Sequence, residues 1–178
     1  MSTGRPPLPR ARLLFGRDAI ARRVAALGAA VSRDFAGGDL VLLGVLTGAF
    51  VFLADLARTL SIPARVDFVG VSSYGAGATP GPLTVTKEPS LDLRGRDVLL
   101  VEDLVDTGAS LVTIRELVAP RAPRSLRACA LLDKRWRRAT EVSLDYVGFT
   151  IERGFVVGYG IDHAGEGRCL PDLWALPE

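Results

Sequence analysis

The segment spanning residues 98–110 constrains the fold of this chain more than any other part of its sequence. Four consecutive apolar residues, 98–101, are followed directly by the acids Glu102 and Asp103, and the run Asp106-Thr-Gly-Ala-Ser110 comes shortly after. Apolar residues then recur at helical spacing. This order predicts a buried parallel strand, a tight loop and the N-terminus of a helix. The backbone N–H groups of such a junction can bind phosphate, and the neighbouring acids can hold sugar hydroxyls or a magnesium ion.

The rest of the chain alternates in the same way between apolar runs and segments of helical periodicity. We predict helices over residues 18–35, 49–60 and 109–118, and strands over residues 40–46, 65–72, 83–86, 97–102, 126–132, 146–151 and 155–159, the last two as a late pair. Alternation of strand and helix predicts an α/β fold with a parallel twisted sheet flanked by helices. Ligands bind outside the carboxyl ends of the strands in such sheets, so the polar residues that follow four of these strands should share one rim.

Length and composition favour a single domain. The chain has 178 residues, and we expect residues 1–15 to be a flexible leader and residues 16–178 to form one domain. A formal net charge of +2 gives no argument for binding nucleic acid or a membrane. The longest uncharged run, residues 40–54, is shorter than the ~20 residues of a membrane span, so we expect a cytoplasmic protein. Cys129 and Cys169 lack the spacing of a metal site and are either bridged or free thiols.

Four segments together resemble one known family. Val101-Glu-Asp-Leu-Val-Asp-Thr-Gly-Ala-Ser110 resembles the phosphoribosyl-diphosphate motif of the type I phosphoribosyltransferases, in the variant found in the hypoxanthine/guanine branch. Residues 45–55 are similar to the first loop of that branch, residues 66–75 to the approach to its mobile loop, and residues 145–162 to its purine-binding end. The resemblance implies the type I phosphoribosyltransferase fold, with a small hood formed by the terminal segments.

The resemblance implies a role for each part of the ribosyl-donor site. The loop 106–110 would hold the 5′-phosphate, and Glu102 and Asp103 would bind the ribose hydroxyls directly or through magnesium. Backbone N–H groups around Thr47 would bind diphosphate, although the commonest pattern of the family has lysine there, and the peptide bond before that residue is often cis in the family. The predicted phosphoribosyl-diphosphate site comprises Leu46, Thr47, Gly48, Ser73, Tyr74, Glu102, Asp103, Asp106, Thr107, Gly108, Ala109, Ser110 and Arg168.

The resemblance also implies a binding site for the purine base, formed by Asp106 and by residues farther along the chain. Asp106 would face N7 of the purine, either as a general base or as an electrostatic stabiliser of charge on the ribose. The ammonium of Lys134 can donate and cannot accept, so it would favour a 6-oxo base over a 6-amino base. The predicted purine site comprises Lys134, Phe155, Val156 and Asp162. The predicted magnesium ligands are Glu102 and Asp103, with Asp162 holding a second magnesium ion or its waters near the diphosphate.

Two further segments complete the hypothesis. The Gly/Pro-rich residues 75–82, approached through Ser73 and Tyr74, would form a lid that excludes water from the reacting centre. The basic side chains Arg135, Arg137 and Arg138 are expected in solvent or at a subunit contact, and His163 is expected to play no catalytic part.

The predicted activity is transfer of a 5-phosphoribosyl group from phosphoribosyl diphosphate to N9 of hypoxanthine or guanine. It would give IMP or GMP and diphosphate, with Mg²⁺ as cofactor and a homodimer or homotetramer as the assembly. One alternative is an enzyme of the same class that prefers xanthine. The other is a nucleotide-sensing regulator on the same fold, which need not keep Asp106, Lys134 and Phe155 together.

Overall fold

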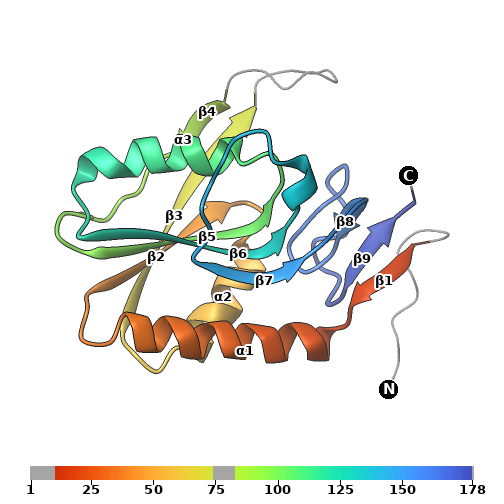
Figure 1. Cartoon of the computed structure of the whole chain (residues 1–178), viewed down its shortest axis with the longest axis horizontal. Helices are drawn as coiled ribbons and strands as arrows, with labels where there is room; N and C mark the ends of the chain where they lie inside the picture. Colours follow the sequence, from red (N-terminus) through yellow and green to blue (C-terminus); the bar gives the residue numbers. More distant parts are fainter. Residues whose placement is uncertain (1–10, 74–82, 178) are drawn as a thin grey trace.

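The computed structural model describes residues 11–73 and 83–177, which form two sheets and their covering helices (Figure 1). The elements in chain order are β1 (Arg12–Phe15), α1 (Arg17–Asp34), β2 (Leu40–Leu46), α2 (Phe50–Thr59), β3 (Ala64–Ser73), β4 (Leu83–Lys87), β5 (Asp97–Val105), α3 (Ala109–Val118), the 3-10 helix η1 (Ala119–Arg121), β6 (Ser125–Asp133), the 3-10 helix η2 (Arg135–Arg137), β7 (Tyr146–Thr150), β8 (Phe155–Val157) and β9 (Leu173–Leu176).

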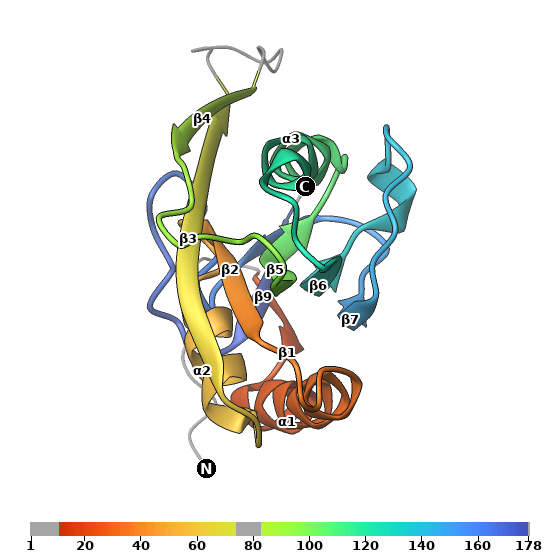
Figure 2. The same ribbon diagram turned by 90° about the vertical axis from the view of Figure 1, so that its left-hand side faces the viewer.

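The larger sheet has the strand order β4-β3-β2-β5-β6-β7. All neighbouring strands from β3 to β7 run parallel, and β4 is antiparallel to β3 at one edge. Helices α1 and α2 cover one face of this sheet and α3 covers the other (Figure 2). The prediction of a parallel sheet flanked by helices is therefore confirmed. The helices and strands lie at the positions predicted from the sequence, apart from shifts of a few residues at their ends.

The central strands are apolar because each is buried on both faces. Alternate residues of β2 point into different cores: Leu40 and Leu42 pack with α1 and α2, whereas Val41 and Leu43 pack with α3. Each such side chain stabilises the fold by about 1.5–3 kcal/mol relative to exposure to water. Two apolar cores on opposite faces hold the strand ends in place and so fix the rim on which the polar residues lie.

The terminal segments form the second sheet, with the order β1-β9-β8 and antiparallel pairing throughout. It lies beyond the carboxyl ends of the parallel strands (Figure 1), where a hood was expected. Two expectations need correction. The late strands do not pair with each other, because β7 pairs with β6 and β8 pairs with β9. Strand β1 also begins inside the expected leader, where Phe15 is held by stacking on Phe149 at 3.9 Å between ring centroids.

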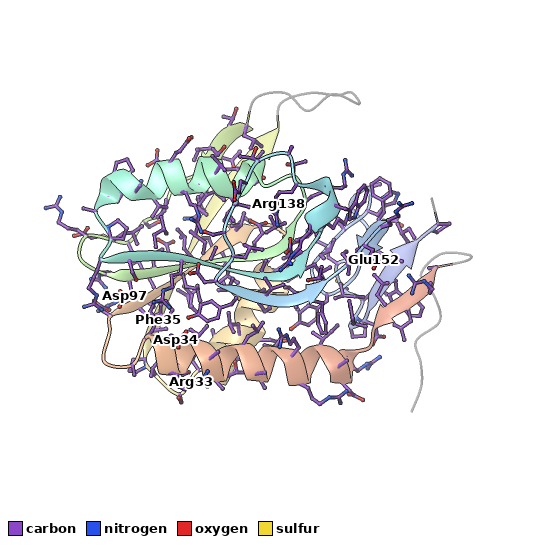
Figure 3. All side chains as sticks on the ribbon, viewed as in Figure 1. Arg33, Asp34, Phe35, Asp97, Arg138 and Glu152 are labelled. Atoms are coloured by element: carbon purple, nitrogen blue, oxygen red, sulfur yellow. The ribbon has the colours of Figure 1, made fainter. Side chains whose placement is uncertain are left out.

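Ion pairs and aromatic contacts fasten the opposite end of the sheet, away from the hood. Asp97 at the start of β5 binds the guanidinium of Arg124, and the Arg127 guanidinium lies over the Phe35 ring, 5.1 Å from its centroid. Figure 3 shows Asp97 and Phe35 at this end of the molecule and Arg138 nearer the carboxyl ends of the strands. Asp97 accordingly serves the fold rather than the predicted site.

Two predictions from composition can be compared with the described residues. Cys129 is buried and Cys169 is exposed, and both are free thiols. Among the helices of residues 11–73 and 83–177, none is long and apolar enough to cross a membrane.

Candidate active site

The loop between β5 and α3 forms a small cradle at the carboxyl edge of the sheet. Gly108 precedes α3 with φ +90°, a left-handed conformation that glycine adopts without steric cost, and a Cβ there would lie 2.9 Å from the carbonyl oxygen of Thr140. The loop borders an open cavity of about 80 Å³, lined by residues of the run from Glu102 to Leu111. The first N–H groups of α3 have no partner within the helix, and they give this cradle a positive end suited to an anion.

Two neighbouring acids lie beside this cradle: Glu102 is buried and borders the cavity, and Asp103 is partly buried. Glu102 and Asp103 fall within the last residues of β5, and Oε2 of Glu102 is buried and accepts no hydrogen bond. Burial raises the pKa of Glu102 well above its ordinary value, and the charge of Asp103 raises it further. Burial also raises the pKa of Asp103, although the nearby charge of Arg168 partly opposes this shift. Such a pair is costly unless a cation or hydroxyl donors arrive.

The β2–α2 loop lies directly against these acids. The peptide bond between Leu46 and Thr47 is cis, as the resemblance led us to expect. A Cβ on Gly48 would collide with the carboxylate of Asp103, so only glycine lets this loop approach so closely. A Cβ on Gly160 would in turn collide with the carbonyl oxygen of Gly48. The structure thus brings together the first loop, the acid pair and the segment that follows β8.

The acid pair has the chemistry of a magnesium site, but it lacks a third protein ligand. Mg²⁺ prefers oxygen ligands, is often bound by only one or two carboxylates, and takes its remaining ligands from phosphates and water. The unpartnered oxygen of Glu102 fits this requirement. Within the described part of the chain, no three His, Cys, Asp or Glu side chains gather into a metal cluster. Asp162, predicted to hold a second magnesium ion, belongs to no such cluster, and that role stays a prediction.

Asp162 is engaged by its own loop instead. Its Oδ1 lies 2.6 Å from Nη2 of Arg168, and its Oδ2 accepts a hydrogen bond of 2.8 Å from the N–H of Gly165. Nη1 of Arg168 donates to the carbonyl oxygen of Gly160 at 2.7 Å. This network holds Arg168 beside the first loop, where its charge can meet an anion.

The predicted catalytic residue and two predicted purine-site residues converge from three different elements. Lys134 follows β6 and is only 3% exposed, and its Nζ lies 3.8 Å from Oδ2 of Asp106 in the β5–α3 loop. The same Nζ lies 5.9 Å from the centroid of the Phe155 ring on β8. Phe155 is 55% exposed, which leaves a ring face free to stack on a planar ligand.

The environment changes the acidity of the lysine. Burial lowers the pKa of Lys134, and the negative charge of Asp106 partly opposes that shift. The side chain of Val156 is buried in the main core, and its backbone pairs with Ala175 of β9. A ligand could therefore meet Val156 only through its backbone.

The arginines that follow Lys134 make more contacts within their own chain than we expected. Nε of Arg135 lies 3.0 Å from Oδ2 of Asp133, and Arg138 binds Oδ1 of the same carboxylate. Nε of Arg137 lies 3.2 Å from Oδ1 of Asp106. The expectation that these arginines are solvated is confirmed for Arg135 and Arg137, whose side chains are 75% and 42% exposed, although each also pairs with an acid of its own chain. Arg138 is only 16% exposed, and a role at a subunit contact stays a prediction. The sequence contains one indication of the ion pairs with Asp133: this residue ends an apolar strand, and a carboxylate buried there needs neighbouring cations.

Part of the predicted lid lies outside the described residues. Ser73 is the last residue of β3, on the same carboxyl edge as the other loops. Tyr74 and residues 75–82 are not among the residues that the structure describes. The lid hypothesis therefore stays a prediction.

The fold and the cradle together are those of an α/β protein with a glycine-containing loop suited to an anion and an acid pair beside that loop. Residues 15–164 match the family model of the phosphoribosyl transferase domain. The chain therefore belongs to the phosphoribosyltransferase family.

Similar proteins narrow the placement within that family. The chain is 45% identical over 155 residues to the hypoxanthine phosphoribosyltransferase of Salmonella typhimurium, covering 85% of this chain and 87% of the relative. It is 37% identical over 169 residues to the hypoxanthine-guanine phosphoribosyltransferase of Aquifex aeolicus, covering 94% and 95%. The structure of a hypoxanthine phosphoribosyltransferase from Staphylococcus aureus superposes with a TM-score of 0.89 at 35% identity, covering 93% and 91% of the two chains. The resemblance to the hypoxanthine/guanine branch is thereby confirmed.

Proposed function

We infer that the protein is a purine-salvage enzyme that transfers a 5-phosphoribosyl group from phosphoribosyl diphosphate to hypoxanthine or guanine. The reaction joins N9 of the base to C1 of the ribose and releases diphosphate. Relatives named hypoxanthine or hypoxanthine-guanine phosphoribosyltransferase match across most of the chain and support this activity. They do not favour a xanthine-preferring enzyme or a regulator.

The convergence of Asp106, Lys134 and Phe155 is the observation that carries the assignment of the base. In a 6-oxopurine, O6 and N7 are neighbours on one edge of the ring. Lys134 and Asp106 lie side by side, 3.8 Å apart, so a donor for O6 and an acceptor for a proton at N7 are presented together. Phe155 supplies a face for stacking. A 6-amino base would bring its own donor toward an ammonium that cannot accept, and so would bind less well.

The donor substrate is proposed to occupy the cradle. Backbone N–H groups and the hydroxyls of Thr107 and Ser110 would hold its 5′-phosphate, and the loop around Thr47, with Arg168, would hold its diphosphate. Asp106 would accept a proton from the incoming base or stabilise the positive charge that develops on the ribose as diphosphate leaves.

Magnesium is proposed as the cofactor, held by Glu102 and Asp103 with the remaining ligands from substrate and water. When bound, the ion would neutralise negative charge on the diphosphate. Asp162 would hold a second magnesium ion or its waters near the diphosphate, and its ion pair with Arg168 would orient that arginine. We also propose a homodimer or homotetramer, which sedimentation equilibrium would decide. Thr47 brings no charge to a subunit contact where the usual family residue is lysine.

One assay tests the activity and its base preference together. Diphosphate release is measured with phosphoribosyl diphosphate, magnesium and, in turn, hypoxanthine, guanine, xanthine and adenine. We expect diphosphate release with hypoxanthine and guanine and little release with adenine. A chelator should abolish the release, and added magnesium should restore it. Preferred use of xanthine would favour that alternative, and binding of phosphoribosyl diphosphate without turnover of any base would favour a regulator.

A further inference from the structure

The carboxylate of Asp106 faces two cations through different oxygens. Oδ2 lies 3.8 Å from Nζ of Lys134, and Oδ1 lies 3.2 Å from Nε of Arg137. Oδ1 is buried and accepts no hydrogen bond, so Arg137 is close enough for a charge contact but is not aligned as a donor. Hydrogen bonds at catalytic groups are often long or misaligned before substrate binds and tighten in the complex.

The backbone couples Arg137 to the loop that carries Asp106. The N–H of Arg137 donates to the carbonyl oxygen of Lys134 at 3.1 Å, which closes the 3-10 turn η2. Just beyond this turn, the N–H groups of Ala139 and Thr140 both donate to the carbonyl oxygen of Thr107, at 3.1 and 3.2 Å. On the other side of the turn, the N–H of Lys134 donates to the carbonyl oxygen of Val105 at 3.0 Å. Backbone hydrogen bonds thus join the η2 segment and the β5–α3 loop on both sides of the Asp106–Arg137 contact.

The side chain of Arg137 also contacts an aromatic ring on the surface. Its guanidinium carbon lies 5.6 Å from the centroid of the Trp136 ring, within the range of a cation–π contact. Trp136 is one of the few large apolar side chains that stay exposed in the described residues. The other two arginines of the run bind Asp133, so Arg137 is the one of the three arginines that pairs with Asp106.

We propose that Arg137 is a positioning residue that binds Oδ1 of Asp106 and thereby leaves Oδ2 to face the purine. This inference rests on the proposed function, in which Lys134 must donate to O6 of the base. Without Arg137, the carboxylate could turn both oxygens toward Lys134 and engage the ammonium that the base requires. With Oδ1 taken by Arg137, Oδ2 stays beside the lysine as the acceptor for the proton at N7. Arg137 acts through Asp106 and need not touch the substrate.

Variants of two arginines in the same 3-10 turn provide the test. Arg137→Gln removes the charge that faces Asp106. Arg137→Lys restores a cation that can reach, because the lysine Nζ lies one bond farther along the side chain than the arginine Nε. Arg135→Gln is the matched control, since Arg135 also makes an ion pair but with Asp133. The assay measures kcat, the KM of hypoxanthine and the KM of phosphoribosyl diphosphate, and thermal unfolding verifies that each variant is folded.

We expect Arg137→Gln to lower kcat/KM for hypoxanthine about tenfold, as for the loss of one charge-assisted contact in a site, with the KM of phosphoribosyl diphosphate within about twofold of the parent. Arg137→Lys should recover a substantial part of that loss, and Arg135→Gln should stay within about twofold. Equal losses in Arg137→Gln and Arg135→Gln, or parental activity in Arg137→Gln, would overturn the proposal. Absence of activity in the parent enzyme would instead refute the proposed function itself.

Discussion

Lys134→Met tests most directly whether the buried lysine selects the base. Methionine has a similar length and no donor, so the variant removes the ammonium and leaves most of the volume filled. Lys134 is only 3% exposed and lies between Asp106 and Phe155, so no solvent-borne cation can easily replace it.

The magnitude follows from the kind of contact that is lost. A hydrogen bond from a charged donor contributes about 1.5–3 kcal/mol, which corresponds to roughly 10- to 150-fold in kcat/KM for hypoxanthine. Adenine gains nothing from the ammonium, because its 6-amino group is itself a donor. Its kcat/KM should therefore not fall, and the preference for hypoxanthine over adenine should shrink by about the same factor.

The assay compares diphosphate release with hypoxanthine and adenine for the parent, Lys134→Met and Lys87→Met. Lys87 is the chain's only other lysine; its Nζ binds Asp67 and the carbonyl oxygen of Phe68, away from the site, so the same substitution there should leave the base preference unchanged. An unchanged preference in Lys134→Met, or an equal change in both variants, would refute the assignment of Lys134 to the purine.

The pH dependence of the same ratio gives a second measurement. Burial lowers the pKa of Lys134, so this side chain loses its charge at a lower pH than an exposed lysine does. The preference for the 6-oxo base should be full below that lowered pKa and should decline as the pH rises through it. In Lys134→Met the ratio should vary little over the same range.

Three further perturbations test other parts of the molecule. Asp106→Asn should lower kcat by roughly 10²–10⁴-fold while binding of phosphoribosyl diphosphate persists, and near-parental kcat would exclude a general-base role. Gly48→Ala should raise the KM of phosphoribosyl diphosphate, because its Cβ collides with Asp103, and an unchanged KM would place that loop outside the donor site. For Asp97, the hydrogen bond from Arg124 lowers the pKa in the folded state, although burial opposes the shift. Its stabilisation is therefore present above the unfolded-state pKa of about 3.9 and is lost as the pH falls through the folded-state pKa. Asp97→Asn should lower the free energy of unfolding by about 1–3 kcal/mol at neutral pH and weaken its acid dependence, as denaturant titrations would detect.

Much of the fold could be predicted because its signals are local. The apolar run that begins β5, the glycine at position 108 and the periodicity of α3 each act over a few residues, so their order along the chain is enough to predict a strand, a loop and a helix. The positions of the phosphate loop and the acid pair follow from that order. The ends of β5 were less predictable: the strand continues through Glu102 and Asp103 to Val105, because pairing with β6 extends to that residue.

Tertiary structure alone decided which distant side chains meet. Local sequence favours a strand at residues 155–157, but only the packing of the terminal segments assigns it to the small sheet and sets Phe155 above Lys134. Residues 134–138 hold four cations, and nothing local distinguishes the two that face Asp106 from the two that face Asp133. The physical reason is that periodicity determines an element and the face it buries, whereas contacts between loops depend on strand order and on the dense packing that fixes each strand end.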